Sequence, residues 1–151
     1  MLLPRCLLFL LLASPGMLAV AEPVVRDAWI RALPPTQPVT AAYAEVSNTG
    51  PTAIALVGAR VEGAGRVEIH TNRDVDGLIR MERLSTLSIP AGQTVSLAPG
   101  GSHFMLFELA GMPRPGEQRQ MCLLFADAGE QCVTAAVRKS ATTDHSHHQH
   151  H

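Results

Sequence analysis

The chain has 151 residues, of which 46% are hydrophobic, 17% charged and 4% aromatic; this length suits one globular domain and is short for two. Twelve Lys and Arg residues against 13 Asp and Glu residues give a formal net charge of -1. Phosphate binding needs a basic face, and the charges in this chain do not cluster. The composition therefore argues against a nucleic-acid partner, and equally against an acidic, disordered chain.

Residues 1–21 have the pattern of a cleaved export signal. A short basic start precedes the apolar run Cys6–Leu12, and Ala19–Ala21 fits the small-x-small rule for signal-peptidase cleavage. Ser14–Gly16 interrupts the run before it reaches the roughly 20 residues of a membrane span. A lipid anchor is disfavoured because the only nearby cysteine precedes the hydrophobic region instead of following it. We therefore expect a mature periplasmic or other extracytoplasmic protein that starts at Glu22 and has no stable membrane span.

The mature chain predicts strands separated by turns rich in Gly and Pro. No helical periodicity competes with the short apolar or alternating segments. In chain order these predicted strands are Val24–Ile30, Thr40–Ser47, Ala53–Ala59, Gly65–His70, Ile79–Leu84, Thr94–Leu97, His103–Leu109, Met121–Ala126 and Gln131–Val137. Such spacing predicts an all-β sandwich or barrel, with one domain over residues 22–138.

The two mature cysteines, Cys122 and Cys132, flank the last predicted hairpin. An oxidising compartment permits a disulfide between them. However, a short turn over residues 127–130 would pair Phe125 with Cys132, and would place Cys122 about three residues along on the opposite face. A bridge would then need a bulge or another register, so the sequence leaves open both a disulfide and two buried free thiols.

The folded body contains only two of the seven histidines, His70 and His103, because five lie in the last seven residues. His103 and Met105 are two residues apart in a predicted strand, so both side chains leave the same face. The segment 74–77 suits a type I turn, with Asp first and Gly fourth. A hairpin closed there places Met81 directly opposite His70, with β-carbons roughly 5 Å apart. We therefore expect each histidine to have a methionine neighbour.

Two imidazoles and two thioethers form a ligand set with a specific chemical preference. Thioether sulfur is a soft, neutral donor that suits Cu(I) and suits Zn(II), Ca(II) or Mg(II) poorly. It needs no deprotonation and cannot be lost to a disulfide. Four neutral ligands would leave the site positively charged, which makes exchange with another copper site feasible. The structural alternative is that the methionines fill the core and the histidines are ordinary surface residues.

The spacing His70-x10-Met81-x21-His103-x-Met105 resembles the signature of the PCuAC-type periplasmic copper chaperones. The resemblance extends over most of residues 24–138, and includes the segments 27–31, 41–43, 48–50, 89–92 and 99–101. It implies a cupredoxin-like β-barrel that carries Cu(I) on these four residues and supplies centres such as the dinuclear copper site of cytochrome c oxidase. One departure is that family members often have Met just after the first His, whereas Thr71 and Asn72 follow His70 here.

Residues 139–151 form a predicted flexible, His-rich tail that offers a second candidate metal site. Its candidate ligands are His145, His147, His148, His150 and His151. A flexible polar segment imposes no geometry, so it would bind Cu(II), Ni(II) or Zn(II) with little discrimination. The alternative is a purification tag, which the interruptions by Ser146 and Gln149 disfavour.

The sequence thus predicts a non-enzymatic, extracytoplasmic copper chaperone with a copper-donating or copper-accepting protein partner. One alternative is a copper-dependent enzyme or a Cu(II)-scavenging copper-tolerance protein dominated by the tail. Another is a β-sandwich interaction module without metal. A blue-copper electron carrier is disfavoured because Cys122 has no His and Met close after it on one loop.

Overall fold

The computed structural model describes residues 23–139, so the predicted export signal and the five tail histidines, His145, His147, His148, His150 and His151, lie outside the described residues. The described chain consists of strands joined by turns. In order they are β1 (Pro23–Arg31), β2 (Thr40–Asn48), β3 (Ile54–Val61), β4 (Ala64–Val75), β5 (Leu78–Leu84), β6 (Leu87–Ile89), β7 (Thr94–Leu97), β8 (His103–Leu109), β9 (Gln118–Phe125) and β10 (Gly129–Arg138). The all-β prediction is confirmed. Over residues 23–139 there is no helix with the length and apolar character needed to cross a bilayer.

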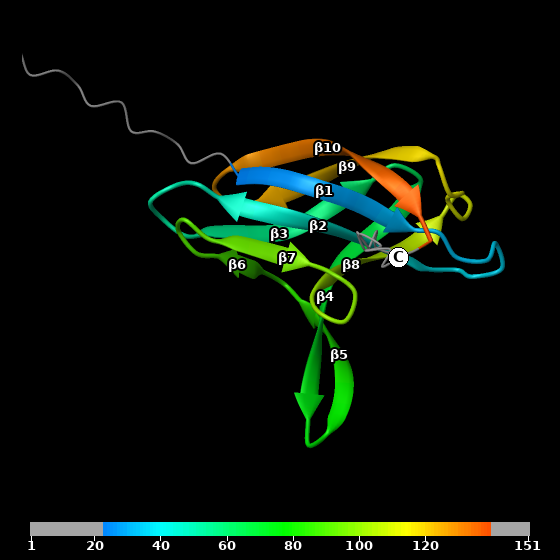
Figure 1. The fold of residues 1–151 in the computed structure, drawn as a ribbon, viewed down its shortest axis with the longest axis horizontal. Coiled ribbons are helices and arrows are strands. Elements are labelled where there is room, and N and C mark those ends of the chain that lie inside the picture. Colours follow the sequence, from blue (N-terminus) through cyan, green and yellow to red (C-terminus); the bar gives the residue numbers. More distant parts are fainter. Residues whose placement is uncertain (1–22, 140–151) are drawn as a thin grey trace, which may run out of the picture.

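One continuous sheet contains these strands and folds back on itself around the core (Figure 1). Its strand order is β5-β4-β8-β2-β1-β10-β9-β3-β6, and β7 also pairs with β2. The β1–β10 pair is parallel, whereas β1 and β2 are antiparallel. Strand β6 was not predicted, because its three residues are too few to show alternation and it is held by pairing with β3.

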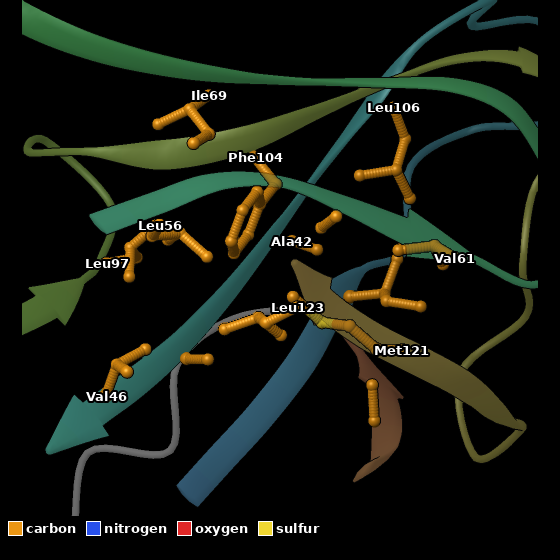
Figure 2. Packing of buried hydrophobic residues seen from close by; sticks show 14 of the residues in the cluster. Ala42, Val46, Leu56, Val61, Ile69, Leu97, Phe104, Leu106, Met121 and Leu123 are labelled. Carbon is orange, nitrogen blue, oxygen red and sulfur yellow. The ribbon is translucent and has the colours of Figure 1, made fainter. Parts of the chain in front are cut away.

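Alternation along β8 separates the core from the outer face of the sheet. Phe104 and Leu106 are each 0% exposed and point into the core with Leu56 and Leu123 (Figure 2). Successive side chains of a strand point to opposite faces. His103, Met105 and Phe107 therefore share the outer face, where the strands β5, β4, β8 and β2 lie side by side.

The β4–β5 hairpin closes at a different turn from the predicted one. The structure pairs Val75 with Leu78, which leaves Asp76 and Gly77 as a two-residue turn. Both have positive φ, 56° and 80°, which matches the type I′ turn that fits the twist of a hairpin. Asp74 contributes through Oδ1, which accepts a hydrogen bond of 2.8 Å from the Gly77 N–H. The predicted type I turn over residues 74–77 was therefore wrong.

The observed pairing register of β4 and β5 differs from the predicted one by two residues. His70 lies opposite Arg83, and Met81 lies opposite Asn72, so the predicted His70–Met81 pair does not form. A shift of two residues keeps every side chain on its own face, because strands alternate with a period of two. Met81 therefore remains on the face of His70, two residue pairs further along the hairpin.

A disulfide joins Cys122 and Cys132, which pair directly across β9 and β10 with a Cα–Cα distance of 3.9 Å. The predicted Phe125–Cys132 pairing was wrong, because Phe125 pairs with Gly129 and a three-residue turn separates them. Gly129 has a φ of 70°, a conformation that glycine adopts without strain. This turn is one residue shorter than the predicted four-residue turn, and it supplies the other register that a bridge requires.

Removing this disulfide should cost about 2–3 kcal/mol of stability, because it closes a loop of 10 residues in the unfolded chain. The test is urea denaturation of the double variant C122S/C132S beside the oxidised wild type. Wild type treated with dithiothreitol is the control and should unfold at the same urea concentration as the variant. Equal stability of oxidised wild type and variant would show that the bridge does not constrain the unfolded chain.

Candidate metal site

Both body histidines lie on the outer face of the sheet at one place. His70 on β4 pairs directly with His103 on β8, and the ring centroids are 6.2 Å apart. Met105 is two residues beyond His103 and pairs with Glu68. His103 and Met105 therefore leave the same face of β8, as their spacing predicts.

Met81 approaches this group from the side, on an arm. Beyond its pairing with β8, strand β4 continues with β5 as a two-stranded hairpin that projects from the body (Figure 1). Met81 lies opposite Asn72, so it is a diagonal neighbour of His70, and diagonal neighbours are about 7–8 Å apart. Its side chain is 54% exposed, which rules out a role as core filler.

Three of the four predicted ligands line one cavity of about 270 Å³. They are Met81, His103 and Met105, which come from β5 and β8. The other lining residues are Arg31, Leu33, Val39, Thr40, Ala41, Tyr43, Asn72, Pro99 and Gly100. His70 is not part of this wall and adjoins it through its pairing with His103. The fold thus brings together residues that are distant in sequence at a single, largely apolar place.

Each imidazole has one nitrogen engaged. His103 is 6% exposed, and its Nδ1 lies 3.0 Å from the carbonyl oxygen of Gly101. A carbonyl only accepts, so His103 Nδ1 carries the proton and Nε2 keeps its lone pair. His70 Nε2 lies 2.9 Å from Glu68 Oε2, whereas His70 Nδ1 is buried without a hydrogen-bond partner among the described residues. Each ring therefore retains one nitrogen that could bind a metal ion.

Glu68 is a residue of the candidate site that was not predicted from the sequence. Its side chain is 10% exposed and contacts His70, Arg66 and Arg83. The hydrogen bond from His70 lowers the pKa of Glu68 against the opposing effect of burial, and the positive charges of Arg83 and Arg66 lower it further. Glu68 is therefore ionised at neutral pH. Alternation could have revealed it, because it stands two residues before His70 on the same face.

Aromatic side chains form a wall beside His103. The Tyr43 ring lies 6.4 Å from that of His103 and stacks on Trp29 at 4.3 Å. Arg31 lies over Tyr43 at 5.5 Å, and Arg138 lies over Trp29 at 4.6 Å. Trp29 and Tyr43 are each 3% exposed, although they lie outside the main core. The packed rings and guanidinium groups fix one side of the candidate site.

Tyr43 should ionise only above the usual range for tyrosine. Burial raises the pKa of Tyr43 above 10.0, and the positive charge of Arg31 offsets part of this effect. Because the pKa of Tyr43 is higher in the folded state than in the unfolded state, the protonated side chain favours folding. This contribution to stability is complete below about pH 10 and is lost as the pH rises through the folded-state pKa.

The chain contains one tyrosine, so the increase in absorbance near 295 nm with rising pH reports the ionisation of Tyr43. The native protein should titrate at higher pH than the urea-unfolded protein, and stability should fall on the alkaline side. Coincident native and unfolded titration curves would contradict the burial argument.

Known proteins resemble this chain in sequence and in fold. Residues 24–137 match the family described as "Putative lipoprotein LpqE-like". "Putative lipoprotein Lxx21020" of Leifsonia xyli subsp. xyli is 36% identical over 115 residues, which are 76% of this chain and 68% of that protein.

Solved PCuAC domains share the architecture. The copper-bound PCuAC domain from PmoF2 is 28% identical with a TM-score of 0.66, over 80% of this chain and 95% of that one. The apo PCuAC domain from PmoF1 is 29% identical with a TM-score of 0.66, over 78% and 93%. CuI-DR1885 from Deinococcus radiodurans is 31% identical with a TM-score of 0.65, over 83% and 84%. These similarities confirm the predicted fold class. Together with the family match over residues 24–137, they support one assignment: the chain belongs to the LpqE-like family.

Proposed function

We propose that this protein is an extracytoplasmic copper chaperone that holds one Cu(I) ion with His70, Met81, His103 and Met105. The observation that carries the proposal is the meeting of Met81, His103 and Met105 at one cavity, with His70 paired to His103. The similarity to solved structures described as copper-bound and CuI forms supports it. The LpqE-like family and its relative are named as lipoproteins, which agrees with a location outside the cytoplasm.

The chemistry of the site favours Cu(I) over harder ions. Two thioethers and two neutral imidazoles suit a soft monovalent ion, and none of the four carries a negative charge. Arg31 lines the same cavity, and its guanidinium group lies over the ring of Tyr43, another lining residue. A nearby positive charge repels a divalent ion more strongly than a monovalent one. The site therefore selects against Cu(II), Zn(II) and Ca(II) by both ligand type and charge.

The exposure of Met81 provides a route for transfer. His103 is buried, whereas Met81 is 54% exposed on the projecting arm, next to the exposed apolar residues Leu78 and Ile79. An incoming protein can therefore reach the ion from the Met81 side and replace the four neutral ligands stepwise. The chemistry needs no enzymatic step. The recipient is a copper protein in the same compartment, such as cytochrome c oxidase during assembly.

Anaerobic titration with Cu(I) tests this function against the tail-dominated alternative. Full-length protein and a variant that ends at Lys139 should bind one Cu(I) equally tightly, because the four ligands lie in the body. X-ray absorption should show sulfur and nitrogen around Cu(I). Loss of tight binding on truncation would favour a scavenger that uses the tail histidines. Failure of both proteins to retain copper would favour an interaction module without metal.

A further inference from the structure

The carboxylate of Glu68 is held from two sides. Its Oε2 faces His70 Nε2 at 2.9 Å, while Oε1 faces Arg66 and, at 3.5 Å, Arg83. The side chain is 10% exposed. Because both oxygens have partners from β4 and β5, the carboxylate has a fixed orientation toward the His70 ring. Arg66 also lies 4.0 Å from the centre of the Phe107 ring, which restrains the guanidinium group in turn.

This arrangement determines where His70 carries its proton. Both oxygens of Glu68 face N–H groups, those of Arg66 and Arg83 on one side and His70 Nε2 on the other, and a carboxylate in that setting accepts hydrogen bonds, so the proton between Glu68 and His70 belongs to His70 Nε2. The lone pair then lies on Nδ1, which is buried and has no hydrogen-bond partner among residues 23–139. Buried polar atoms rarely lack a partner. An orphaned nitrogen on the ring that pairs with His103 fits the role of a metal ligand.

From this geometry we infer that Glu68 is a positioning residue that fixes the Nε2–H form of His70, so that His70 offers Nδ1 and His103 offers Nε2 to Cu(I). The inference rests on the proposed copper function. Histidines that bind metals usually donate the other ring N–H to a carboxylate or a backbone carbonyl, which fixes the ring and strengthens the ligand. The Glu68 carboxylate accepts this hydrogen bond from His70, and the Gly101 carbonyl accepts it from His103.

Glu68 also connects the arm to the body of the site. Arg83 forms an ion pair with Glu68. It lies opposite His70 in the strand register and is two residues from Met81 on β5. The same carboxylate thus orients one imidazole ligand and restrains the strand that carries a thioether ligand. Loss of Glu68 should therefore weaken Cu(I) binding through both ligands, although Glu68 itself does not touch the ion.

Nitrogen-15 NMR of the full-length wild-type protein tests the inference without any substitution. In the absence of copper, the long-range ¹H–¹⁵N spectrum should show the Nε2–H form at His70 and the Nδ1–H form at His103. On addition of Cu(I), the shifts should move at His70 Nδ1 and His103 Nε2. Copper retained with His70 bonded through Nε2 would overturn the inference and leave the chaperone function standing. No copper-induced shift at either ring would overturn both.

Two variants test the contribution of the carboxylate to affinity. E68Q keeps the size of the side chain and removes its charge, and should lower Cu(I) affinity about 10- to 100-fold and allow both His70 tautomers. The control is E82Q on β5, because Glu82 pairs with Arg73 at 2.7 Å and lies opposite Thr71, on the face away from Met81. E82Q should leave affinity and tautomer unchanged. Wild-type affinity and an unchanged His70 tautomer in E68Q would overturn the role of Glu68.

Discussion

Replacing His103 with alanine is expected to lower the affinity for Cu(I) by more than about a hundredfold, because the loss of groups that only orient a ligand already costs 10- to 100-fold. His103 lines the cavity with Met81 and Met105 and pairs with His70, so its imidazole is the part of the proposed ligand set that adjoins all the others. Competition with a Cu(I) chelator under anaerobic conditions measures the change.

The matched control is His148→Ala, which removes an imidazole from the tail and should leave tight binding unchanged. A second control, Met112→Leu, removes a thioether that lines a separate cavity with Gly63 and Arg114. Circular dichroism must show that H103A is folded, because His103 is buried and bonded to the Gly101 carbonyl. Wild-type affinity in folded H103A would exclude the proposed ligand set.

Local rules predicted the faces of the strands well. A period of two places His103 and Met105 together on β8 regardless of what packs beneath them. The predicted face of Met81 was also correct although the predicted hairpin register was wrong. The true pairing differs by two residues, which leaves Met81 on the face of His70. The faces on which His103, Met105 and Met81 lie could therefore be predicted from alternation alone, whereas their meeting at one cavity depends on how the strands pair.

The pairing register and the side-chain contacts depend on the turn conformation and on contacts between strands, which local sequence patterns do not contain. Asp74–Gly77 permits more than one turn, and the choice of Asp76–Gly77 follows from the twist that two long strands impose. Arg80 and Glu82 share a face with Ile69, and both side chains are exposed because the arm leaves the core beyond Ile69. Alternation along β4 places Glu68 on the face of His70, but its contact with Arg83 depends on the β4–β5 register and could not be read from the local pattern.

Replacing Phe104 with alanine should cost about 3–5 kcal/mol of stability, because it removes a fully buried aromatic ring. Phe104 is 0% exposed and lies in the core with Leu56 and Ala42 around it (Figure 2). The neighbouring strand backbones cannot collapse far enough to fill the space, because β8 is paired on both sides by β4 and β2. Urea denaturation measures the loss.

Substitutions on the core face of β8 should therefore lower stability, whereas substitutions of ligands on its outer face should lower Cu(I) affinity. F104A should unfold at much lower urea concentration and, while folded, keep Cu(I) affinity within about tenfold, because the outer-face ligands are retained. Phe107→Ala is the control, since that ring lies on the outer face under Arg66 and its loss should cost about 1 kcal/mol. If F107A were as unstable as F104A, or F104A lost copper as completely as H103A, the division of β8 into a core face and a ligand face would not hold.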